Sequence, residues 1–322
     1  MSNKDQVLTA LRAREGEFCS GEALAASLGV SRNAVWKGVT ALRRAGYPIE
    51  AVTNRGYRLI NAGDVLDEGG IRATLRADAE DLRFDIREEV SSTNLIAKER
   101  AQAGEAEGLV VMARRQSAGR GRLGRFFHSP EGTGLYMSLL LRPALPATDA
   151  LLLTTAAAVA VCEAIETLSE KKAGIKWVND VFVDGKKVCG ILTEAGLDIE
   201  SGGMAWAVVG IGVNLRAPQG GFPPEIAHIA GSVFDDDAPA QGRSRLAAEI
   251  LNRFMPMYRA AGERAFVKAY RERSLAIGRT VTLMPGGERA LALDVDSDCR
   301  LIVRMPDGQS RALSSGEISI KL

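Results

Sequence analysis

A polar loop enclosed by two apolar segments is the feature of this 322-residue chain that most constrains its fold. Residues 109–113 and 135–141 are almost wholly apolar and predict two buried strands. The connection between them, residues 114–125, carries five arginines and three glycines and is called the arginine loop below. Guanidinium groups and exposed backbone amides are suited to hold phosphate oxygens. The alternative is a flexible tract that binds nucleic acid, but such tracts usually lie in disordered tails, so the position favours a ligand loop.

Composition indicates an ordinary globular protein without a metal or disulfide framework. With 46% hydrophobic residues, the chain can bury the cores of two or three domains. Its four cysteines lie far apart and it has only two histidines, so neither disulfides nor a zinc site are expected. The longest apolar stretch, residues 150–165, includes two threonines and a glutamate and predicts a buried helix rather than a membrane span. We therefore expect a cytoplasmic protein with no membrane role.

The amino-terminal segment differs from the rest of the chain in charge and in pattern. Residues 1–60 hold nine basic and five acidic side chains, a net +4, whereas the whole chain carries +1. Apolar spacing predicts three short helices, of which the second and third begin after the N-cap residues Ser20 and Ser31. Two strands, at 49–52 and 56–59, follow around a Thr-Asn-Arg-Gly turn. This order predicts a winged helix-turn-helix.

The third predicted helix is basic, and in a winged helix-turn-helix it enters the major groove of DNA. The predicted DNA-binding residues on this helix and the wing are Arg32, Asn33, Lys37, Arg43, Arg44 and Arg55, with Arg58 also placed to reach the backbone. The segment also fits a small helical domain with a solvated basic face. Trp36 fits a surface contact and a buried core position about equally well. The wing directly after the basic helix favours operator DNA as a partner.

A cluster of hydroxyl and amide side chains, Ser92-Thr93-Asn94, stands between a predicted strand at 82–88 and a predicted helix at 95–102. The commoner use of such residues is to cap the helix. The alternative is that they form hydrogen bonds with the polar head of an uncharged ligand at the start of the helix. The sequence at this point leaves both interpretations open.

A second group of polar residues follows the buried helix predicted at residues 150–165. Asn179 and Asp180 precede a hairpin with the turn Asp184-Gly185, and Lys187 lies on the returning strand. An amide and a carboxylate here are suited to a nucleotide and Mg²⁺, and the lysine offers a point charge for carboxylate and phosphate groups. Taken alone, Asn-Asp before a strand is usually a turn. Together with the arginine loop, this hairpin forms the candidate ATP site. The chain has no Gly-Lys-Ser or Gly-Lys-Thr of a P-loop.

The carboxy-terminal part predicts one helix over residues 245–271 and then a strand-rich segment. Proline, glycine and aspartate separate the strand-like runs, which are expected at 280–283, 291–295, 301–303 and 318–320. Short strands with such connections predict a small β-barrel, to which the fold alone assigns no chemistry.

Together these motifs resemble those of the biotin protein ligases, in the same order and at the same spacing. The matching residues are Ser92-Thr93-Asn94, Gln116, Gly119-Arg120-Gly121-Arg122, Lys176-Trp177, Asn179-Asp180, Lys187 with the following Val-Cys-Gly-Ile-Leu, and Ser315-Gly316-Glu317-Ile318-Ser319. The resemblance covers the chain from end to end and implies an α+β protein of three domains. These are a winged helix-turn-helix DNA-binding domain (1–62), a mixed-sheet α/β catalytic domain like the class II synthetases and biotin ligases (63–274), and an SH3-like β-barrel (275–322).

The resemblance implies an ATP-dependent ligase that is also a repressor. Biotin and ATP would give biotinyl-5'-AMP, from which biotin passes to a lysine of biotin carboxyl carrier protein, and the adenylate would promote homodimerisation and repression of biotin synthesis genes. Lys187, Arg120 and Arg122 would be catalytic. The residues facing biotin would be Ser92, Thr93, Asn94, Gln116, Arg120, Gly121, Arg122 and Lys187. The residues facing ATP or the adenylate would be Gly119, Arg122, Arg125, Lys176, Asn179, Asp180 and Asn214, with Asp180 also a ligand of Mg²⁺.

One departure from the family pattern is visible, and two rival functions remain open. The family usually has a tryptophan shortly after the arginine loop, whereas Phe127 keeps the ring here and lacks the indole donor. Loop closure is the family property that depends on this position. One rival is a lipoate-type protein ligase on the same kind of fold. The other is a ligand-sensing DNA-binding repressor that has lost ligase activity, although the intact Lys187, Asn179 and Asp180 argue against a decayed site.

Overall fold

The computed structural model describes residues 3–14, 16–44, 47–60, 64–198, 200, 202–235 and 242–320. Contacts divide the chain into two compact units. One comprises Met1–Ala73 with Ala238–Arg245, and the other comprises Thr74–Asp237 with Leu246–Leu322. The domain boundary expected at residue 62 lies outside the described residues.

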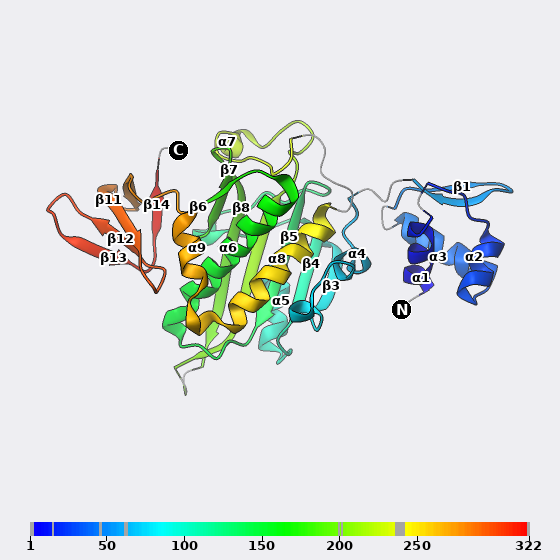
Figure 1. Cartoon of the computed structure of the whole chain (residues 1–322), viewed down its shortest axis with the longest axis horizontal. Helices are drawn as coiled ribbons and strands as arrows, with labels where there is room; N and C mark the ends of the chain where they lie inside the picture. Colours follow the sequence, from blue (N-terminus) through cyan, green and yellow to red (C-terminus); the bar gives the residue numbers. More distant parts are fainter. Residues whose placement is uncertain are drawn as a thin grey trace. The chain divides into compact units, whose positions relative to one another are not determined.

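The first unit has the element order of a winged helix-turn-helix, as predicted (Figure 1). Ser20 Oγ accepts a hydrogen bond from the backbone N of Ala23 at 3.0 Å and caps the second helix, and Ser31 Oγ accepts one from Ala34 at 3.1 Å at the start of the third. In the wing turn, Asn54 adopts a φ of 66°. The elements are α1 (Asn3–Arg12), α2 (Gly21–Leu28), α3 (Arg32–Arg44), β1 (Ile49–Val52), β2 (Gly56–Leu59) and α4 (Glu68–Arg72).

The core of this unit determines which face of α3 is exposed. The residues that pack together include Val7, Leu8, Leu11, Leu24, Val35, Val39, Leu42, Ile49 and Leu59. Since α3 turns Val35, Val39 and Leu42 inward, its basic side chains lie on the outer face. Arg32, Asn33, Lys37, Arg43 and Arg44 are all exposed, as DNA binding requires.

A mixed sheet of seven strands forms the frame of the second unit and confirms the predicted central fold. Its order is β3-β4-β5-β9-β8-β7-β6; β3 and β4 run parallel, and the other neighbours are antiparallel. The strands are β3 (Arg83–Val90), β4 (Leu109–Gln116), β5 (Gly134–Leu141), β6 (Ala173–Lys176), β7 (Asp180–Val183), β8 (Lys186–Leu197) and β9 (Met204–Asn214). Residues 114–116, which were predicted as the start of the arginine loop, extend strand β4 instead. The rest of the loop joins two adjacent strands, β4 and β5, as predicted.

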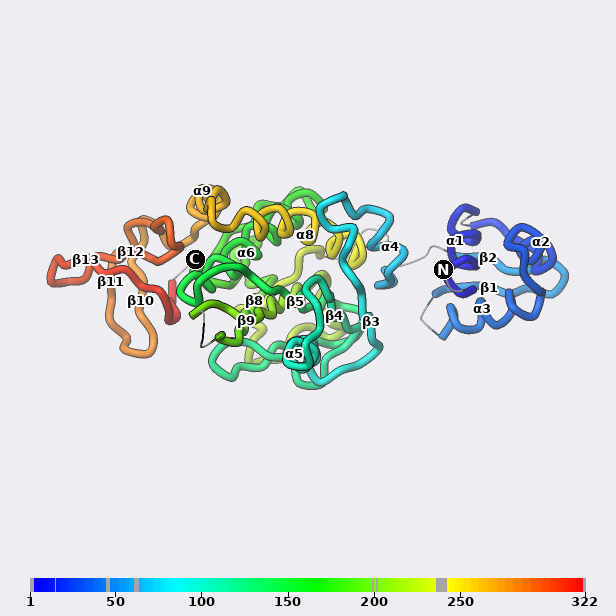
Figure 2. Tube along the Cα trace, turned by 90° about the horizontal axis from the view of Figure 1, so that it is seen from below, coloured from blue at the N-terminus to red at the C-terminus, as the bar shows by residue number. Residues whose placement is uncertain are grey.

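Helices cover both faces of this sheet. Figure 2 shows α6 and α8 on one face and α5 on the other. By length and composition Ala147–Ser169 would pass as a membrane span, but 72% of its most apolar window is buried inside the protein, as predicted for a core helix. The helices are α5 (Thr93–Gln102), α6 (Ala150–Ser169), α7 (Pro224–Ala227), α8 (Gly242–Arg259) and α9 (Phe266–Glu272), and short 3-10 turns lie at Ala77–Ala79, Arg122–Gly124, Ala147–Asp149 and Ala261–Glu263.

The prediction of a single helix over residues 245–271 is wrong. Helix α8 ends at Arg259 and α9 begins only at Phe266, with a 3-10 turn and the left-handed Arg264 (φ 58°) between them. The apolar pattern continues across this break because Ala261 and Phe266 are buried, at 2% and 5% exposure. The pattern of buried residues therefore continues through a segment that is not helical, and this pattern led to the prediction of a single helix.

The carboxy-terminal residues form an antiparallel sheet of five strands in the order β13-β12-β11-β10-β14. The strands are β10 (Thr280–Met284), β11 (Glu288–Val295), β12 (Leu301–Arg304), β13 (Ser310–Leu313) and β14 (Glu317–Ser319). Four of them were predicted. Strand β13 was missed because it is an edge strand whose mostly exposed residues give no apolar alternation.

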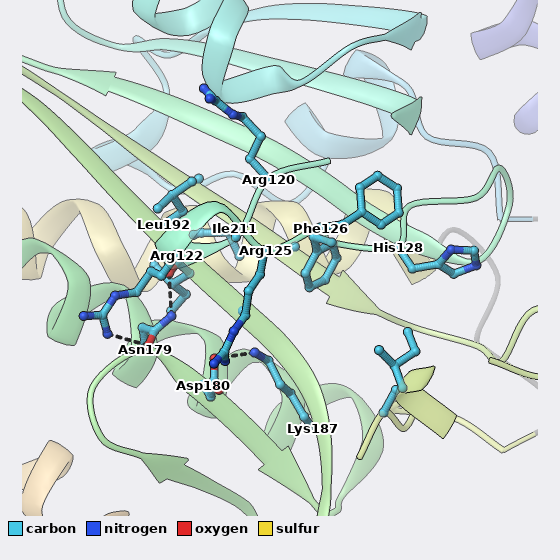
Figure 3. A pocket seen from close by; sticks show the side chains of 18 of the residues that line it. Arg120, Arg122, Arg125, Phe126, His128, Asn179, Asp180, Lys187, Leu192 and Ile211 are labelled. Carbon is cyan, nitrogen blue, oxygen red and sulfur yellow. Dashed lines mark hydrogen bonds and ion pairs between the residues drawn. The ribbon is translucent and has the colours of Figure 1, made fainter. Parts of the chain in front are cut away.

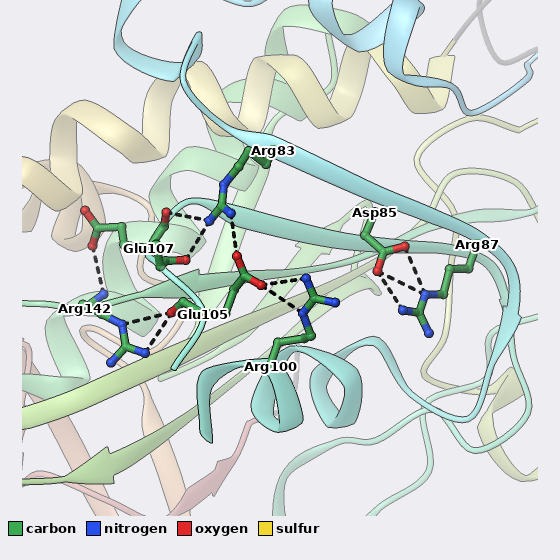
Figure 4. Close-up of polar contacts among 8 residues, drawn as sticks. Arg83, Asp85, Arg87, Arg100, Glu105, Glu107 and Arg142 are labelled. Atoms are coloured by element: carbon green, nitrogen blue, oxygen red, sulfur yellow. Dashed lines mark hydrogen bonds and ion pairs between the residues drawn. The ribbon is translucent and has the colours of Figure 1, made fainter. Parts of the chain in front are cut away.

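An ion-pair network ties the start of β3 to α5 and the turn after it (Figure 4). The carboxylate of Glu105 lies 2.5 Å from a guanidinium nitrogen of Arg83 and 2.6 Å from one of Arg100. Hydrogen bonds from Arg83 and then Arg100 lower the pKa of Glu105. Arg142 also donates to the backbone oxygen of Glu105, at 2.8 Å, which anchors the same turn to the end of β5.

We expect Glu105→Gln to lower the thermal unfolding midpoint at neutral pH by a small amount, because surface ion pairs contribute little. The folded pKa of Glu105 lies below its ordinary value of 4.5, so its contribution is present above that pH and is lost as the pH falls through the folded pKa. The midpoints of the two proteins should therefore converge in acid. A constant difference across a titration from neutral to strongly acidic pH would contradict this prediction.

Candidate active site

The second unit contains a cavity of about 520 Å³ bounded by the arginine loop, α5, the sheet and the end of the carboxy-terminal sheet (Figure 3). Every biotin- or nucleotide-binding residue predicted from the sequence lines it except Gly119. They are Ser92, Thr93, Asn94, Gln116, Arg120, Gly121, Arg122, Arg125, Lys176, Asn179, Asp180, Lys187 and Asn214. The fold thus gathers into one cavity the motifs that the sequence spreads over more than one hundred positions.

The arginine loop folds back on itself as a short hairpin. The backbone N of Phe127 donates to the carbonyl oxygen of Gly119 at 2.9 Å, and that of Gly121 donates to Arg125 at 2.7 Å. A Cβ at position 119 would lie 2.3 Å from the carbonyl oxygen of Phe127. Gly119 therefore permits the two arms of the loop to approach closely and does not itself face the cavity.

Two loop arginines reach the β7–β8 side of the cavity, whereas the side chain of Arg120, which also lines the cavity, points away from that side (Figure 3). Arg122 donates to Asn179 Oδ1 and to the carbonyl oxygen of Gly316, both at 3.0 Å. Arg125 forms an ion pair with Glu317 at 2.7 Å. The loop is therefore bonded both to Asn179, directly before β7, and to the carboxy-terminal sheet.

A buried hydrogen-bond network forms the uncharged end of the cavity. Gln116 Oε1 accepts hydrogen bonds from the backbone N of Thr93 at 2.8 Å and from its Oγ1 at 3.2 Å. Ser138 Oγ, fully buried, lies 2.8 Å from Thr93 Oγ1 and 2.6 Å from Asn94 Oδ1. Ser92 stands at the N-cap position of α5 but its side chain makes no capping hydrogen bond. The cluster is thus part of the cavity wall and does not act as an ordinary side-chain helix cap.

Asn94 is held by groups that the sequence analysis missed. Its Nδ2 donates to the carbonyl oxygen of Leu192 and to Glu194 Oε2, both at 3.2 Å. A Cβ at Gly210 of β9 would lie only 2.0 Å from Asn94 Oδ1. A glycine inside a strand pattern marks such a close approach, and this is the signal that could have identified the position.

Phe127, which stands where the family usually has tryptophan, lines the floor of the cavity. Its ring lies over the backbone of β8 and β9, since a Cβ at Gly212 would lie 2.6 Å from it and one at Gly190 would lie 3.3 Å from it. The ring also packs edge-on against Tyr136, with centroids 6.4 Å apart. Two strand glycines therefore make the space that this aromatic side chain occupies.

The opposite end of the cavity is charged and is built by β6, β7 and β8. Lys187 Nζ lies 2.6 Å from Asp180 Oδ1, and Lys176 is the cross-strand partner of Asp180 in the β6–β7 pair. Burial lowers the pKa of Lys176. Asn179 donates from Nδ2 to the carbonyl oxygen of Ile191 at 2.9 Å, which leaves its Oδ1 for Arg122.

Glu317 brings the carboxy-terminal sheet into the site, a role that the sequence analysis did not assign. Burial opposes its ionisation, but the hydrogen bond from Arg125 and the charges of Lys176 and Lys187 together lower the pKa of Glu317. The charged end thus holds four cations, including Arg122, and the two carboxylates of Asp180 and Glu317. This excess of positive charge suits a polyanionic ligand.

Magnesium fits this site only as an ion shared with a phosphate ligand. Oδ1 of Asp180 is shielded from solvent and makes an ion pair but no well-directed hydrogen bond. The described residues contain no group of three or more His, Cys, Asp or Glu side chains that would hold a metal by themselves. Mg²⁺ commonly uses one or two carboxylates together with substrate phosphates, which is what Asp180 can offer.

We expect Gly210→Ala to weaken biotin binding and to destabilise the protein by about 1 to 3 kcal/mol, because the new methyl group overlaps the buried Asn94. The apparent KM for biotin should rise while the KM for ATP changes little. Gly262→Ala is a matched control, since nothing lies within 4 Å of a Cβ there. Equal effects of the two substitutions on KM would contradict the prediction; thermal melts and steady-state kinetics provide the measurements.

Comparison with known proteins defines the class to which this fold and site belong. The model of the biotin/lipoate A/B protein ligase family matches residues 87–214, that of an HTH domain matches 3–58, and that of the biotin protein ligase C-terminal domain matches 276–321. The chain is 36% identical over 304 residues to the bifunctional ligase/repressor BirA of Bacillus spizizenii, covering 93% of each chain. The chain therefore belongs to the biotin protein ligase family.

Relatives and solved structures agree with this assignment. Identity to the bifunctional ligase/repressor BirA of Escherichia coli is 28% over 320 residues, with 95% of this chain and 94% of that one covered. The structure of the Aquifex aeolicus biotin protein ligase in complex with biotin and ATP matches with a TM-score of 0.61 at 27% identity, over 74% of this chain and 97% of that chain. The amino-terminal HTH domain places the chain with the relatives whose names combine ligase and repressor.

Proposed function

We propose that the chain forms biotinyl-5'-AMP from biotin and ATP, transfers biotin to a lysine of biotin carboxyl carrier protein, and represses biotin synthesis genes through its winged helix. The observation that carries the ligase proposal is the cavity itself, which joins an uncharged hydrogen-bonding end to a strongly cationic end. Biotin has an uncharged ureido head and a carboxylate tail, and ATP is a polyanion. The two ends of the cavity match these chemistries.

Binding of the biotin head is assigned to the buried network around Gln116. Ser92, Thr93 and Gln116 offer hydroxyl and amide groups at the cavity wall. The amide of Asn94 is already bonded to Leu192, Glu194 and Ser138, so Asn94 shapes this end. Because these polar groups are buried and held in place by one another, only a ligand whose donors and acceptors fit their fixed positions gains hydrogen bonds here, which gives selectivity.

Adenylation is assigned to positioning and charge compensation. A carboxylate oxygen of biotin attacks the α-phosphorus of ATP, and the bond from that phosphorus to the pyrophosphate oxygen breaks. The two reactants are both anionic. Lys187 and Arg122 offset their repulsion from the charged end, and Arg120 contributes once its side chain turns from its present direction toward the reactants. Arg125, Lys176, Asn179 and Asn214 hold the nucleotide, and Gly121 leaves room for it beside the loop.

Transfer needs no enzyme nucleophile. The lysine amine of the carrier protein attacks the acyl carbon of the mixed anhydride, AMP leaves, and the amine loses one proton. The chain's own contribution is to keep the adenylate in the cavity, where the loop hairpin and Phe127 limit access of water. Mg²⁺, held by Asp180 and the phosphates, would supply further positive charge at the triphosphate.

Regulation is assigned to the first unit and to a homodimer. The exposed basic face of α3 and the exposed Arg55 of the wing support contact with operator DNA. Leu123 of the arginine loop and Phe126 directly after it are 77% and 61% exposed, which supports a loop that joins a dimer contact when the adenylate is bound. The loop would then couple ligand occupancy to DNA binding.

The ligase proposal is tested by mixing the full chain with ATP, Mg²⁺ and a biotin acceptor domain, and by offering biotin and lipoate as competing acyl donors. ATP-dependent acylation of the acceptor lysine with biotin, with release of AMP, is the expected result. Acylation with lipoate alone would identify the lipoate-type rival. DNA binding without any acylation would identify a repressor that has lost ligase activity.

A further inference from the structure

Helix α3 carries an aromatic side chain that nothing in its unit covers. Trp36 is 55% exposed, although its neighbours Val35 and Val39 are buried at 0% and 2%. The sequence left a surface contact and a core position as equal alternatives for this residue. In the structure, Trp36 is a surface residue.

The other aromatic residues described in this unit are all covered. Phe18 lies under the guanidinium groups of Arg55 and Arg58, at 4.2 and 4.5 Å from its centroid. Tyr47 is 3% exposed, and Tyr57 packs against the core cluster. A large exposed indole is therefore not a general feature of this unit and calls for a partner.

The charges around Trp36 identify the kind of partner. Helix α3 contains Arg32, Lys37, Arg43 and Arg44 and no acidic residue. Arg32 stands one helical turn before Trp36 and Thr40 one turn after it, so the ring belongs to the same outer face as the cations. An apolar ring set among four cations and no acids is complementary to a polyanion that also presents apolar groups, and the major groove of DNA does so through thymine methyl groups.

We propose that Trp36 packs against the C5-methyl group of thymine in the major groove and so reads a thymine-containing sequence. This inference rests on the proposed DNA-binding function and adds to it a residue that selects sequence. The cations of α3 contact phosphates, which hold the protein on any duplex, and Trp36 supplies apolar contact that only certain sequences satisfy. Its place in the first half of α3 is where residues of a recognition helix meet base edges.

The test replaces single thymines by deoxyuridine, which removes only the methyl group. The probe is a duplex enriched from a random pool by the full chain in the presence of biotin and ATP. Each thymine of its consensus is replaced in turn, and affinity is measured at fixed salt. We expect at least one replacement to weaken binding about fourfold, the value of one buried methyl group. With Trp36→Ala the same replacement should have no further effect.

Two matched variants separate this contact from general effects on the unit. Ile60→Ala also removes an exposed apolar side chain, 47% exposed, and should leave the deoxyuridine effect unchanged. Lys37→Ala should weaken binding about equally on all duplexes and reduce the salt slope by about one, as expected for a phosphate contact. Thermal melts of all variants verify that the unit remains folded.

The outcomes distinguish the inference from the function on which it rests. If the wild-type chain enriches a sequence but no deoxyuridine replacement weakens it, or if Trp36→Ala keeps the full effect, the role of Trp36 is refuted while DNA binding stands. If the wild-type chain enriches no sequence at all, the proposed repressor function fails, and the inference fails with it.

Discussion

Replacing Lys187 with alanine is expected to abolish formation of biotinyl-5'-AMP, with a loss of at least about 10³-fold in kcat/KM. Lys187 Nζ lies in the cavity beside Asp180, and the neighbouring cation Lys176 lies across β7 from it. Removing the ammonium takes away the part of the positive charge that Lys187 sets against the repulsion between the biotin carboxylate and the α-phosphate, and it also leaves Asp180 without its ion pair. Pyrophosphate exchange with biotin and ATP measures this step without the acceptor protein.

Lys186→Ala provides the control for this experiment. Lys186 precedes Lys187 on the same strand, but its Nζ donates to the backbone oxygen of His228 at 2.8 Å and does not line the cavity. This variant should keep its adenylation activity, and DNA binding by Lys187→Ala should persist because α3 is untouched. Adenylation by Lys187→Ala at the wild-type rate would remove Lys187 from the proposed mechanism.

Deleting residues 1–60 is expected to eliminate operator binding and to leave ligation within about twofold of the full chain, since the cavity lies in the separate compact unit Thr74–Asp237 with Leu246–Leu322. The deletion removes α1 to α3 and the wing, and with them every predicted DNA contact. It also removes Arg12, whose guanidinium pairs with Asp67 at 2.8 Å. Asp67 still caps α4, because its Oδ1 accepts from the backbone N of Gly70 at 2.9 Å. Gel shifts and acceptor biotinylation measure the two activities side by side.

A double variant of the full chain controls for a loss of DNA binding that comes only from shortening the protein. The double variant Arg32→Ala and Lys37→Ala in the full chain should reduce operator binding strongly and leave biotinylation unchanged, because both side chains are exposed on α3. Operator binding by the shortened chain would show that α3 is not the reader. A parallel loss of ligation would show that the first unit contributes to catalysis.

Helices α1 to α3 and the wing of the first unit could be predicted closely because their signals are local, whereas the short helix α4 was not predicted. Ser20 and Ser31 cap their helices in the structure as their position in the sequence suggests, and the strands of the wing match residue for residue. Local signals also account for the hairpin at Asp184 and Gly185, where both residues adopt the positive φ that such a turn requires.

Prediction failed where the signal was not local. The break between α8 and α9 was missed because Ala261 and Phe266 continue the apolar period through it, and β13 was missed because an exposed edge strand has no period at all. Within the site, Ser138 looks like one polar residue in an apolar strand. Only its distances to Thr93 and Asn94 reveal that it supports two residues that line the cavity.

The sequence by itself determined the chemistry of this protein. The arginine loop, the Asn-Asp pair and Lys187 place cationic and amide side chains at a spacing that suits phosphate and carboxylate ligands and few others. The tertiary structure decided which backbone and side chains complete the site. Gly210 and Gly212 matter only because Asn94 and Phe127 fill the space above them, and Glu317 matters only because the carboxy-terminal sheet brings it to Arg125. Such contacts join residues far apart in the chain, and their geometry exists only once the chain has folded.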